Sequence, residues 1–116
     1  MPVASVLTTC VPAGLAERDL LPYEAAGRLA RTFQVLGNDT RLRLLHALAR
    51  EGELSVGDLA GAIGMKAQAT SNQLQRLVDR GIVASRREGT RVIYRIEDPC
   101  VPQLLELALC LTEGEQ

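Results

Sequence analysis

The chain has 116 residues, the length of one domain rather than two. It is 47% hydrophobic but only 3% aromatic, so its core must be aliphatic, which suits helices better than a β-sandwich or a barrel. The formal net charge of −1, taken alone, argues weakly against nucleic acid as a partner.

The charges are nevertheless unevenly distributed along the chain. Residues 66–95 carry seven basic side chains against Asp79 and Glu88, a net charge of +5, whereas residues 96–116 carry five acidic side chains and no basic one. A basic block within one stretch is typical of a nucleic-acid-binding surface, and it also arises by chance on a solvated surface. Charge alone leaves these two interpretations open.

The sequence indicates neither a membrane helix nor export. No apolar run approaches the ~20 residues that a membrane helix needs, and the first residues lack the basic start of a secretory signal. We therefore expect a cytoplasmic protein, in which thiols stay reduced. The three cysteines are also an odd number, which fits a disulfide framework poorly.

The first half of the chain predicts an arm and two helices. Residues 1–14 show no period and are interpreted as a flexible arm, ahead of one domain over residues 15–116. Pro22 would interrupt a helix that begins over residues 15–22. A firmer helix is expected over about 23–36, with Leu29, Phe33 and Leu36 on one face. The next, over about 39–51, has an apolar stripe of Leu42, Leu45, Leu48 and Ala49, with Arg41, Arg43 and Arg50 facing outward.

The second half predicts two further helices, a hairpin and a last helix. A short helix over 56–63 begins at the N-cap Ser55 and ends at Gly64, and a longer one covers about 67–80. Two β-rich runs, 82–87 and 90–96, then form a hairpin in which Ile93 breaks the alternation of apolar and polar residues. The helix over about 100–112 is apolar on nearly all sides and needs burial against a partner subunit. The predicted fold is therefore mainly α with a small β-hairpin.

A short helix, a tight glycine-containing turn and a longer helix form a helix-turn-helix, and the hairpin adds a wing. The second helix would present uncharged polar groups to base edges: Gln68, Thr70, Ser71, Asn72 and Gln73. Basic side chains that flank them would hold phosphates: Lys66, Arg76 and Arg80, with Arg86, Arg87 and Arg91 near the tip of the wing. A winged helix that binds protein instead of DNA is the alternative.

Three ordered motifs resemble the signature of the ArsR/SmtB family of metal-responsive repressors: Val35 to Leu45 (VLGNDTRLRLL), Ser55 to Ala60 (SVGDLA), and Thr70 to Leu74 (TSNQL) leading into Gly81-Ile82-Val83. The resemblance spans about residues 23–113. It implies a dimeric winged-helix repressor that releases operator DNA when an ion binds. Asn72 stands where the family commonly has His, and Lys66 stands where a Ser cap is common, so operator choice is expected to differ.

The family places inducer sites at different positions, and the cysteines indicate one of them. The first helix of the helix-turn-helix, beginning Ser55-Val56-Gly57-Asp58, offers no thiol or imidazole, whereas Cys100 and Cys110 fall on the C-terminal helix at the expected dimer interface. Ten residues of helix span about 15 Å, so these two thiols of one chain cannot share an ion. Antiparallel packing about Leu105 would instead bring Cys100 beside the partner's Cys110, twice per dimer, with Cys10 of the arm as a third ligand.

A site of three thiolates and no imidazole is soft. It suits As(III), Sb(III) or Hg(II) as the inducing ion, suits Cd(II) or Pb(II) less well, and suits Zn(II) and Ni(II) poorly. The single histidine, His46, is interpreted as structural or exposed. A redox-sensing repressor with a disulfide between Cys100 and Cys110 of two subunits remains the alternative. We expect no enzyme, because the chain offers no nucleophile–base pair and no phosphate-binding loop.

Overall fold

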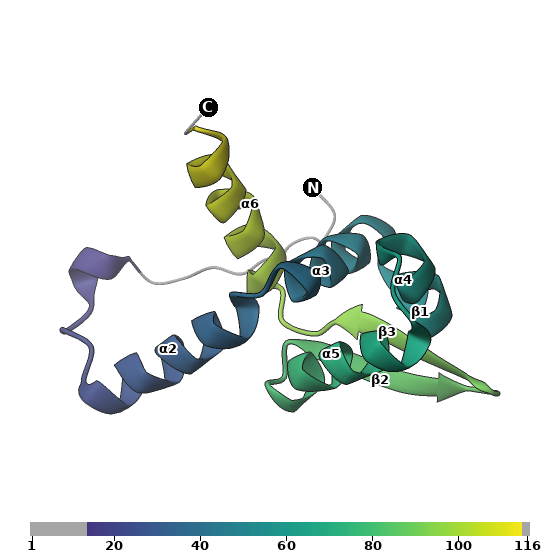
Figure 1. The fold of residues 1–116 in the computed structure, drawn as a ribbon. Coiled ribbons are helices and arrows are strands. Elements are labelled where there is room, and N and C mark those ends of the chain that lie inside the picture. The colour runs from purple at the N-terminus through teal and green to yellow at the C-terminus, as the bar shows by residue number, and fades with distance from the viewer. Residues whose placement is uncertain (1–13, 115–116) are drawn as a thin grey trace, which may run out of the picture.

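The computed structural model describes residues 14–114, so the predicted arm lies outside that range apart from Gly14. A 3₁₀ turn, η1 (Leu15–Glu17), precedes α2 (Tyr23–Leu36), α3 (Asp39–Glu51) and the short strand β1 (Glu53–Ser55). The later elements are α4 (Val56–Ile63), α5 (Ala67–Asp79), β2 (Val83–Glu88), β3 (Arg91–Ile96) and α6 (Cys100–Glu113). Figure 1 shows α3, α4, α5 and the sheet in one body, from which α2 and α6 project.

The predicted bounds of the helices are confirmed to within a residue or two, and side-chain capping sets the starts of α3 and α4. The side chain of Asn38 accepts a hydrogen bond from the backbone N–H of Arg41, 3.1 Å away, at the start of α3. Ser55 Oγ accepts one from the backbone N–H of Asp58, also at 3.1 Å, at the start of α4. Gly64 ends α4 with φ at +72°, a conformation that glycine adopts without strain.

The core lies where α3, α4 and α5 pack against one face of the sheet. Its most deeply buried side chains are aliphatic, as the composition predicts: Leu44, Leu45, Leu48, Leu59, Leu74, Leu77 and Val83. The strands form an antiparallel sheet in the order β1-β3-β2. A helix-turn-helix of α4 and α5 with a β2–β3 wing is a winged helix-turn-helix, so the predicted fold class is confirmed. In the part of the chain that the structure describes, no helix is long and apolar enough to cross a membrane.

Two features of the sheet differ from the sequence prediction. β1 was not predicted, because three residues carry too little pattern; it forms through pairing with β3, with Ser55 opposite Ile93. Ile93 and Tyr94 are both buried, although neighbours on a strand face opposite ways. Tyr94 belongs to the core, whereas Ile93 lies on the other face beside Arg86, whose guanidinium reaches across β3 to Glu53 on β1.

The helices also differ in which residues they bury. On α3 the buried stripe contains Leu44, which was not predicted, whereas Leu42 and Ala49 are exposed. On α2 only Leu36 is buried, and Leu29 and Phe33 remain about half exposed in the single chain. Leu29 and Phe33 lie on α2, which projects from the body in Figure 1.

The capping contact at Ser55 generates a stability prediction. Ser55→Ala removes an acceptor from a buried helix end and is expected to lower the free energy of unfolding by about 1 kcal/mol in urea denaturation. The matched control is Ser85→Ala, because Ser85 is exposed on β2 and should change stability by no more than about 0.5 kcal/mol. Equal losses in the two variants would contradict the capping interpretation.

Candidate functional site: the recognition helix, the wing and the cysteines

The outer face of α5 carries exposed polar and basic side chains, as predicted for a recognition helix. Gln68 and Asn72 lie one turn apart and are hydrogen-bonded to each other, with Gln68 Nε2 donating to Asn72 Oδ1 at 3.0 Å. Lys66 at the start of the helix and Arg76 near its end are exposed as well. This face therefore combines amide groups that can read base edges with cations that can hold phosphates.

Thr70 does not belong to this face, so its prediction as a DNA-contacting residue is wrong. Its side chain is fully buried, and its Oγ1 donates a hydrogen bond to the backbone oxygen of Lys66 at 2.9 Å. Helical spacing explains this position, since residues 70, 74 and 77 form one stripe and Leu74 and Leu77 are core residues. A hydroxyl bonded to its own helix can be buried at little cost, and Thr70 uses that possibility.

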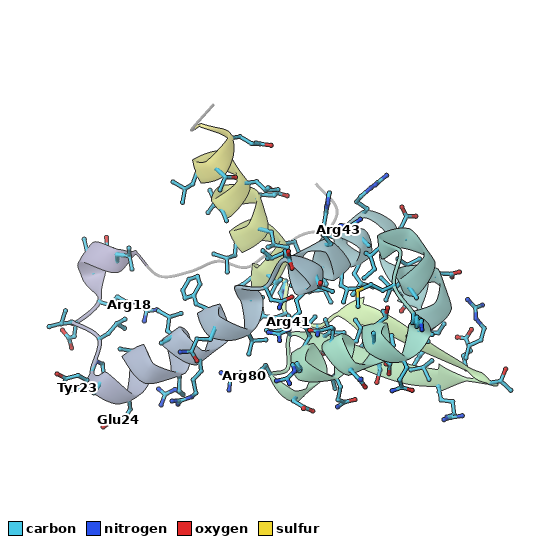
Figure 2. The ribbon with its side chains drawn as sticks, in the orientation of Figure 1. Arg18, Tyr23, Glu24, Arg41, Arg43 and Arg80 are labelled. Atoms are coloured by element: carbon cyan, nitrogen blue, oxygen red, sulfur yellow. The ribbon has the colours of Figure 1, made fainter. Side chains whose placement is uncertain are left out.

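Ser71 and Gln73 are half-buried, and Gln73 has a structural partner. Arg41 Nε donates to Gln73 Oε1 at 2.9 Å, and Arg41 Nη1 donates to the backbone oxygen of Val35 at 2.8 Å. Arg41 was predicted to face outward but is half-buried, at the junction of α2, α3 and α5 (Figure 2). One guanidinium thus fixes the recognition helix to the last turn of α2, and sequence periodicity carried no signal of that contact.

Beyond that junction, Arg80 also connects α5 with α2. Its Nη2 donates to Thr32 Oγ1 at 3.4 Å, a longer contact than those of Arg41, and both side chains lie at the surface. Arg80 is therefore partly engaged with α2 in the single chain.

Ion pairs order the arginines of the wing. Arg86 contacts Glu53 at 2.7 Å and Glu88 at 2.9 Å, and Arg91 contacts Asp58 at 3.3 Å. Hydrogen bonds from Arg86 to Glu53 and Glu88 raise the pKa of Arg86, and the bond to Glu53 lowers the pKa of that carboxyl. Within residues 14–114, Arg87 is the wing arginine that forms no ion pair. Its charge is therefore available to a phosphate without breaking a contact.

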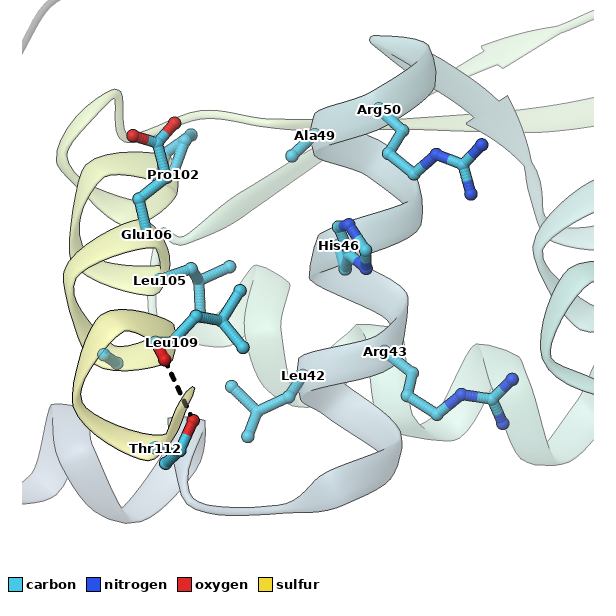
Figure 3. Close-up of a pocket in the computed structure, with 11 residues that line it drawn as sticks. Leu42, Arg43, His46, Ala49, Arg50, Pro102, Leu105, Glu106, Leu109 and Thr112 are labelled. Atoms are coloured by element: carbon cyan, nitrogen blue, oxygen red, sulfur yellow. Dashed lines mark hydrogen bonds between the residues drawn. The ribbon is translucent and has the colours of Figure 1, made fainter. Parts of the chain in front are cut away.

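The cysteines do not form a single-chain metal site within the described residues. Cys110 is a free, exposed thiol near the end of α6, whereas Cys100 begins α6, is half-buried and is disulfide-bonded. That bond does not involve Cys110. Cys10 lies outside the described residues. Over residues 14–114 no group of three or more His, Cys, Asp or Glu side chains could hold a metal ion. His46 is exposed on α3 and lines a pocket together with residues of α6 (Figure 3).

Known proteins with similar sequences are transcriptional regulators. The chain is 42% identical over 93 residues to the HTH-type transcriptional regulator NmtR of Mycobacterium tuberculosis, and the match covers 80% of this chain and 77% of NmtR. A MarR family model matches residues 38–91. The chain belongs to the ArsR/SmtB family. It is a metal-responsive transcriptional repressor of that family, and the prediction of a regulator rather than an enzyme is confirmed.

Solved structures of ArsR/SmtB repressors agree with the fold. The antimony-specific transcriptional repressor AntR is 56% identical to this chain, with a TM-score of 0.79 over 92% of this chain and 97% of AntR. The homodimeric winged helix-turn-helix domain of Mb0332 from Mycobacterium bovis, a possible ArsR-family regulator, is 35% identical. Its TM-score is 0.73 over 87% of this chain and 93% of that domain.

The junction at Arg41 generates the second prediction. Arg41→Lys keeps the charge but cannot bond Val35 and Gln73 in the same fork geometry, so we expect a loss of about 1.5–3 kcal/mol in the free energy of unfolding. Urea denaturation at fixed protein concentration measures it. The control is Arg28→Lys, an exposed position on α2, which should change stability by less than about 0.5 kcal/mol. An Arg41→Lys variant as stable as its control would show that the junction contributes nothing.

Proposed function

We propose that this repressor binds operator DNA as a homodimer, and that a thiophilic ion held by Cys10, Cys100 and Cys110 at the dimer interface releases the DNA. Sb(III) is the first candidate for the ion, followed by As(III) and Hg(II), with Cd(II) and Pb(II) behind them. The observation that carries the proposal is the position of two cysteines at opposite ends of an exposed, apolar α6.

The DNA-binding part of the proposal rests on α5 and the wing. Gln68 and Asn72 would enter the major groove, where amide side chains can pair with adenine. Lys66, Arg76 and Arg87 would contact phosphates on either side. Arg86 and Arg91 would reach DNA only by giving up their carboxylate partners, and Gln73 would contribute through its remaining amide donors. Ser71 is half-buried and would contribute at the edge of the contact.

Dimerisation is supported by the apolar side chains that α2 and α6 expose. Leu107 and Leu111 of α6 are 68% and 76% exposed, and Leu29 and Phe33 of α2 are about half exposed. Exposed leucines on two projecting helices are costly in a monomer and are removed from water when two copies pack together. A relative at 35% identity is homodimeric, as its structure is described.

The ion site would then form between subunits. Cys100 and Cys110 lie ten residues apart on one helix, about 15 Å along its axis, too far to share an ion within a chain. Two α6 helices packed antiparallel about their midpoint would bring Cys100 near Cys110 of the partner subunit, and twofold symmetry would repeat the site. Cys10 would complete each site with a third sulfur.

The donor set favours a soft ion. Three thiolates without an imidazole match the pyramidal three-sulfur coordination of trivalent antimony and arsenic, and two or three of them match Hg(II). AntR, which its structure describes as antimony-specific, is 56% identical to this chain, and this supports placing Sb(III) first. Binding would require deprotonated thiols and would therefore release protons.

The redox alternative concerns the same cysteines. Cys100 is disulfide-bonded in the structure, but not to Cys110, so this bond is not the Cys100–Cys110 pair between subunits that the alternative requires. A redox-sensing repressor would release DNA on oxidation and would not respond to a stoichiometric ion under reducing conditions. A titration in reducing buffer therefore distinguishes an ion-sensing repressor from a redox-sensing one.

The decisive measurement is fluorescence anisotropy of a labelled operator fragment in reducing buffer, titrated separately with Sb(III), As(III), Hg(II), Cd(II) and Zn(II). We expect one soft ion to release the DNA, and we expect Cys100→Ser or Cys110→Ser to abolish release while leaving ion-free DNA binding unchanged. Cys10→Ser should weaken release. If no ion releases the DNA but an oxidant does, the redox alternative replaces the proposal.

A mixing experiment tests whether the site spans the subunits. Cys100→Ser and Cys110→Ser homodimers should each bind no ion, but their heterodimer keeps one intact site, formed by Cys110 of the first chain and Cys100 of the second. After exchange of equimolar variants, ion-binding capacity should return to about a quarter of the wild-type value, because half of the dimers carry one of two sites. If mixing restores nothing, the site does not lie across the dimer.

The DNA interface generates a further prediction. Asn72→Ala should weaken binding to the preferred operator by about 1–3 kcal/mol and relax sequence preference at one position. Arg87→Ala should weaken binding to all sequences alike and reduce the salt slope by about 0.9. Arg28→Ala is the matched control and should leave both quantities unchanged, because Arg28 is exposed on α2, a helix that lies away from the β2–β3 wing in Figure 1. An unchanged salt slope for Arg87→Ala would remove the wing from the interface.

A further inference from the structure

An apolar groove between α3 and α6 is left open in the single chain (Figure 3). Its volume is about 560 Å³, and its floor consists of Leu42 and Ala49 from α3 with Leu105 and Leu109 from α6. Leu42 and Leu109 are 37% and 49% exposed. Open leucines along a groove are a surface that a second chain can cover, at a gain of about 25 cal/mol for each Å² of apolar area.

The α3 side of this groove is basic. Arg43, His46 and Arg50 follow one another along the exposed face of α3 at helical spacing, and all three line the groove. Arg43 donates to the backbone oxygen of Ile63 at 3.3 Å, which leaves its charge unneutralised. Arg50 forms no ion pair with any of residues 14–114. Glu106 is the acidic residue on the opposite rim. A peptide segment with leucines and carboxylates would therefore suit this groove, since its leucines could contact the apolar floor and its carboxylates the basic α3 side.

Residues 15–24, which we name the leading segment, have this composition. Leu15, Leu20 and Tyr23 are 88%, 95% and 95% exposed, so the segment packs against almost nothing in its own chain. Glu17, Asp19 and Glu24 alternate with these apolar residues against one cation, Arg18. Figure 2 shows Arg18, Tyr23 and Glu24 at the end of α2 that points away from the body. The segment thus offers apolar side chains and a net negative charge to a partner surface.

We propose that the leading segment of each subunit lies in the α3–α6 groove of its partner, with leucine side chains on the groove floor and Glu17 and Asp19 facing Arg43, His46 and Arg50. The inference rests on the proposed homodimer and adds to it an exchanged segment. In the structure the segment does not occupy its own groove, since Leu15, Leu20 and Tyr23 are exposed and the 14 residues of α2 carry it about 20 Å from the start of α3. Twofold symmetry makes the exchange reciprocal, so each dimer contains two such contacts.

The absence of tryptophan from the sequence makes the contact directly observable. Leu20→Trp adds a single indole at a position that is 95% exposed in the isolated chain. In the dimer we expect its emission to shift to the blue and its quenching by acrylamide to fall severalfold, and both effects should reverse on dilution into monomers. Thr90→Trp, at the exposed tip of the wing, is the matched control and should emit as a solvated indole at every concentration.

A second variant tests whether the contact runs between subunits. Ala49→Glu places a carboxylate in the groove at a position that is already exposed, so folding should be unaffected while Glu17 and Asp19 are repelled. The Leu20→Trp, Ala49→Glu double variant should emit as a solvated indole by itself. Mixed with an excess of wild-type chain, it should regain the blue-shifted emission, because its leading segment then meets an intact groove.

The outcomes separate this inference from the proposed dimer. If the Leu20→Trp variant sediments as a dimer while its indole emission stays solvated, the exchanged segment is overturned and the dimer is left intact. A blue shift that is independent of concentration, or one that the wild-type chain does not restore in the double variant, also overturns the exchanged segment. Monomeric sedimentation at all concentrations overturns both proposals.

Discussion

The position of the recognition helix depends on one guanidinium. Arg41 sits in the first turn of α3, where Asn38 caps its backbone N–H, and its side chain donates to the last turn of α2 and to Gln73 of α5. Two directed hydrogen bonds from a rigid planar group define an orientation as well as a distance, which a single ammonium cannot do. α2 and α5 are therefore held as one unit around α3, with the core leucines behind them.

Arg41 connects α2, which could contact a partner subunit, with α5, the proposed recognition helix. α2 carries exposed apolar residues that a partner chain could cover, and α5 carries the side chains that would read bases. In the proposed dimer, a change in how two subunits pack through α2 and α6 would act on α5 at Arg41, because this side chain bonds to both α2 and α5. In the proposed dimer, a change in the spacing of the two recognition helices would be enough to weaken DNA binding, since both must match the same duplex.

Much of the fold could be predicted because its signals are local. Caps at Asn38 and Ser55 and the glycine at position 64 define helix ends through their immediate neighbours, and the predicted helices agree with the structure. The errors involve contacts over longer distances. β1 exists because β3 pairs with it, Ile93 is buried in the central strand of the sheet, and Arg41 turns inward because an acceptor lies on α5. Thr70 was predicted to contact DNA because it is polar, although its helical spacing with Leu74 and Leu77 places it on the buried side of α5.

The ordered wing has a further consequence, which concerns entropy. A hairpin that is free to bend must give up backbone and side-chain freedom when it docks, and each ordered residue costs on the order of 1–2 kcal/mol. Here Glu53 and Glu88 already hold Arg86, and Asp58 already holds Arg91, so β2 and β3 are fastened to β1 and α4 before any DNA arrives. The acidic partners therefore reduce the positive charge of the wing and at the same time restrict the side chains of Arg86 and Arg91, and pairs whose side chains are 42–60% exposed contribute little to stability.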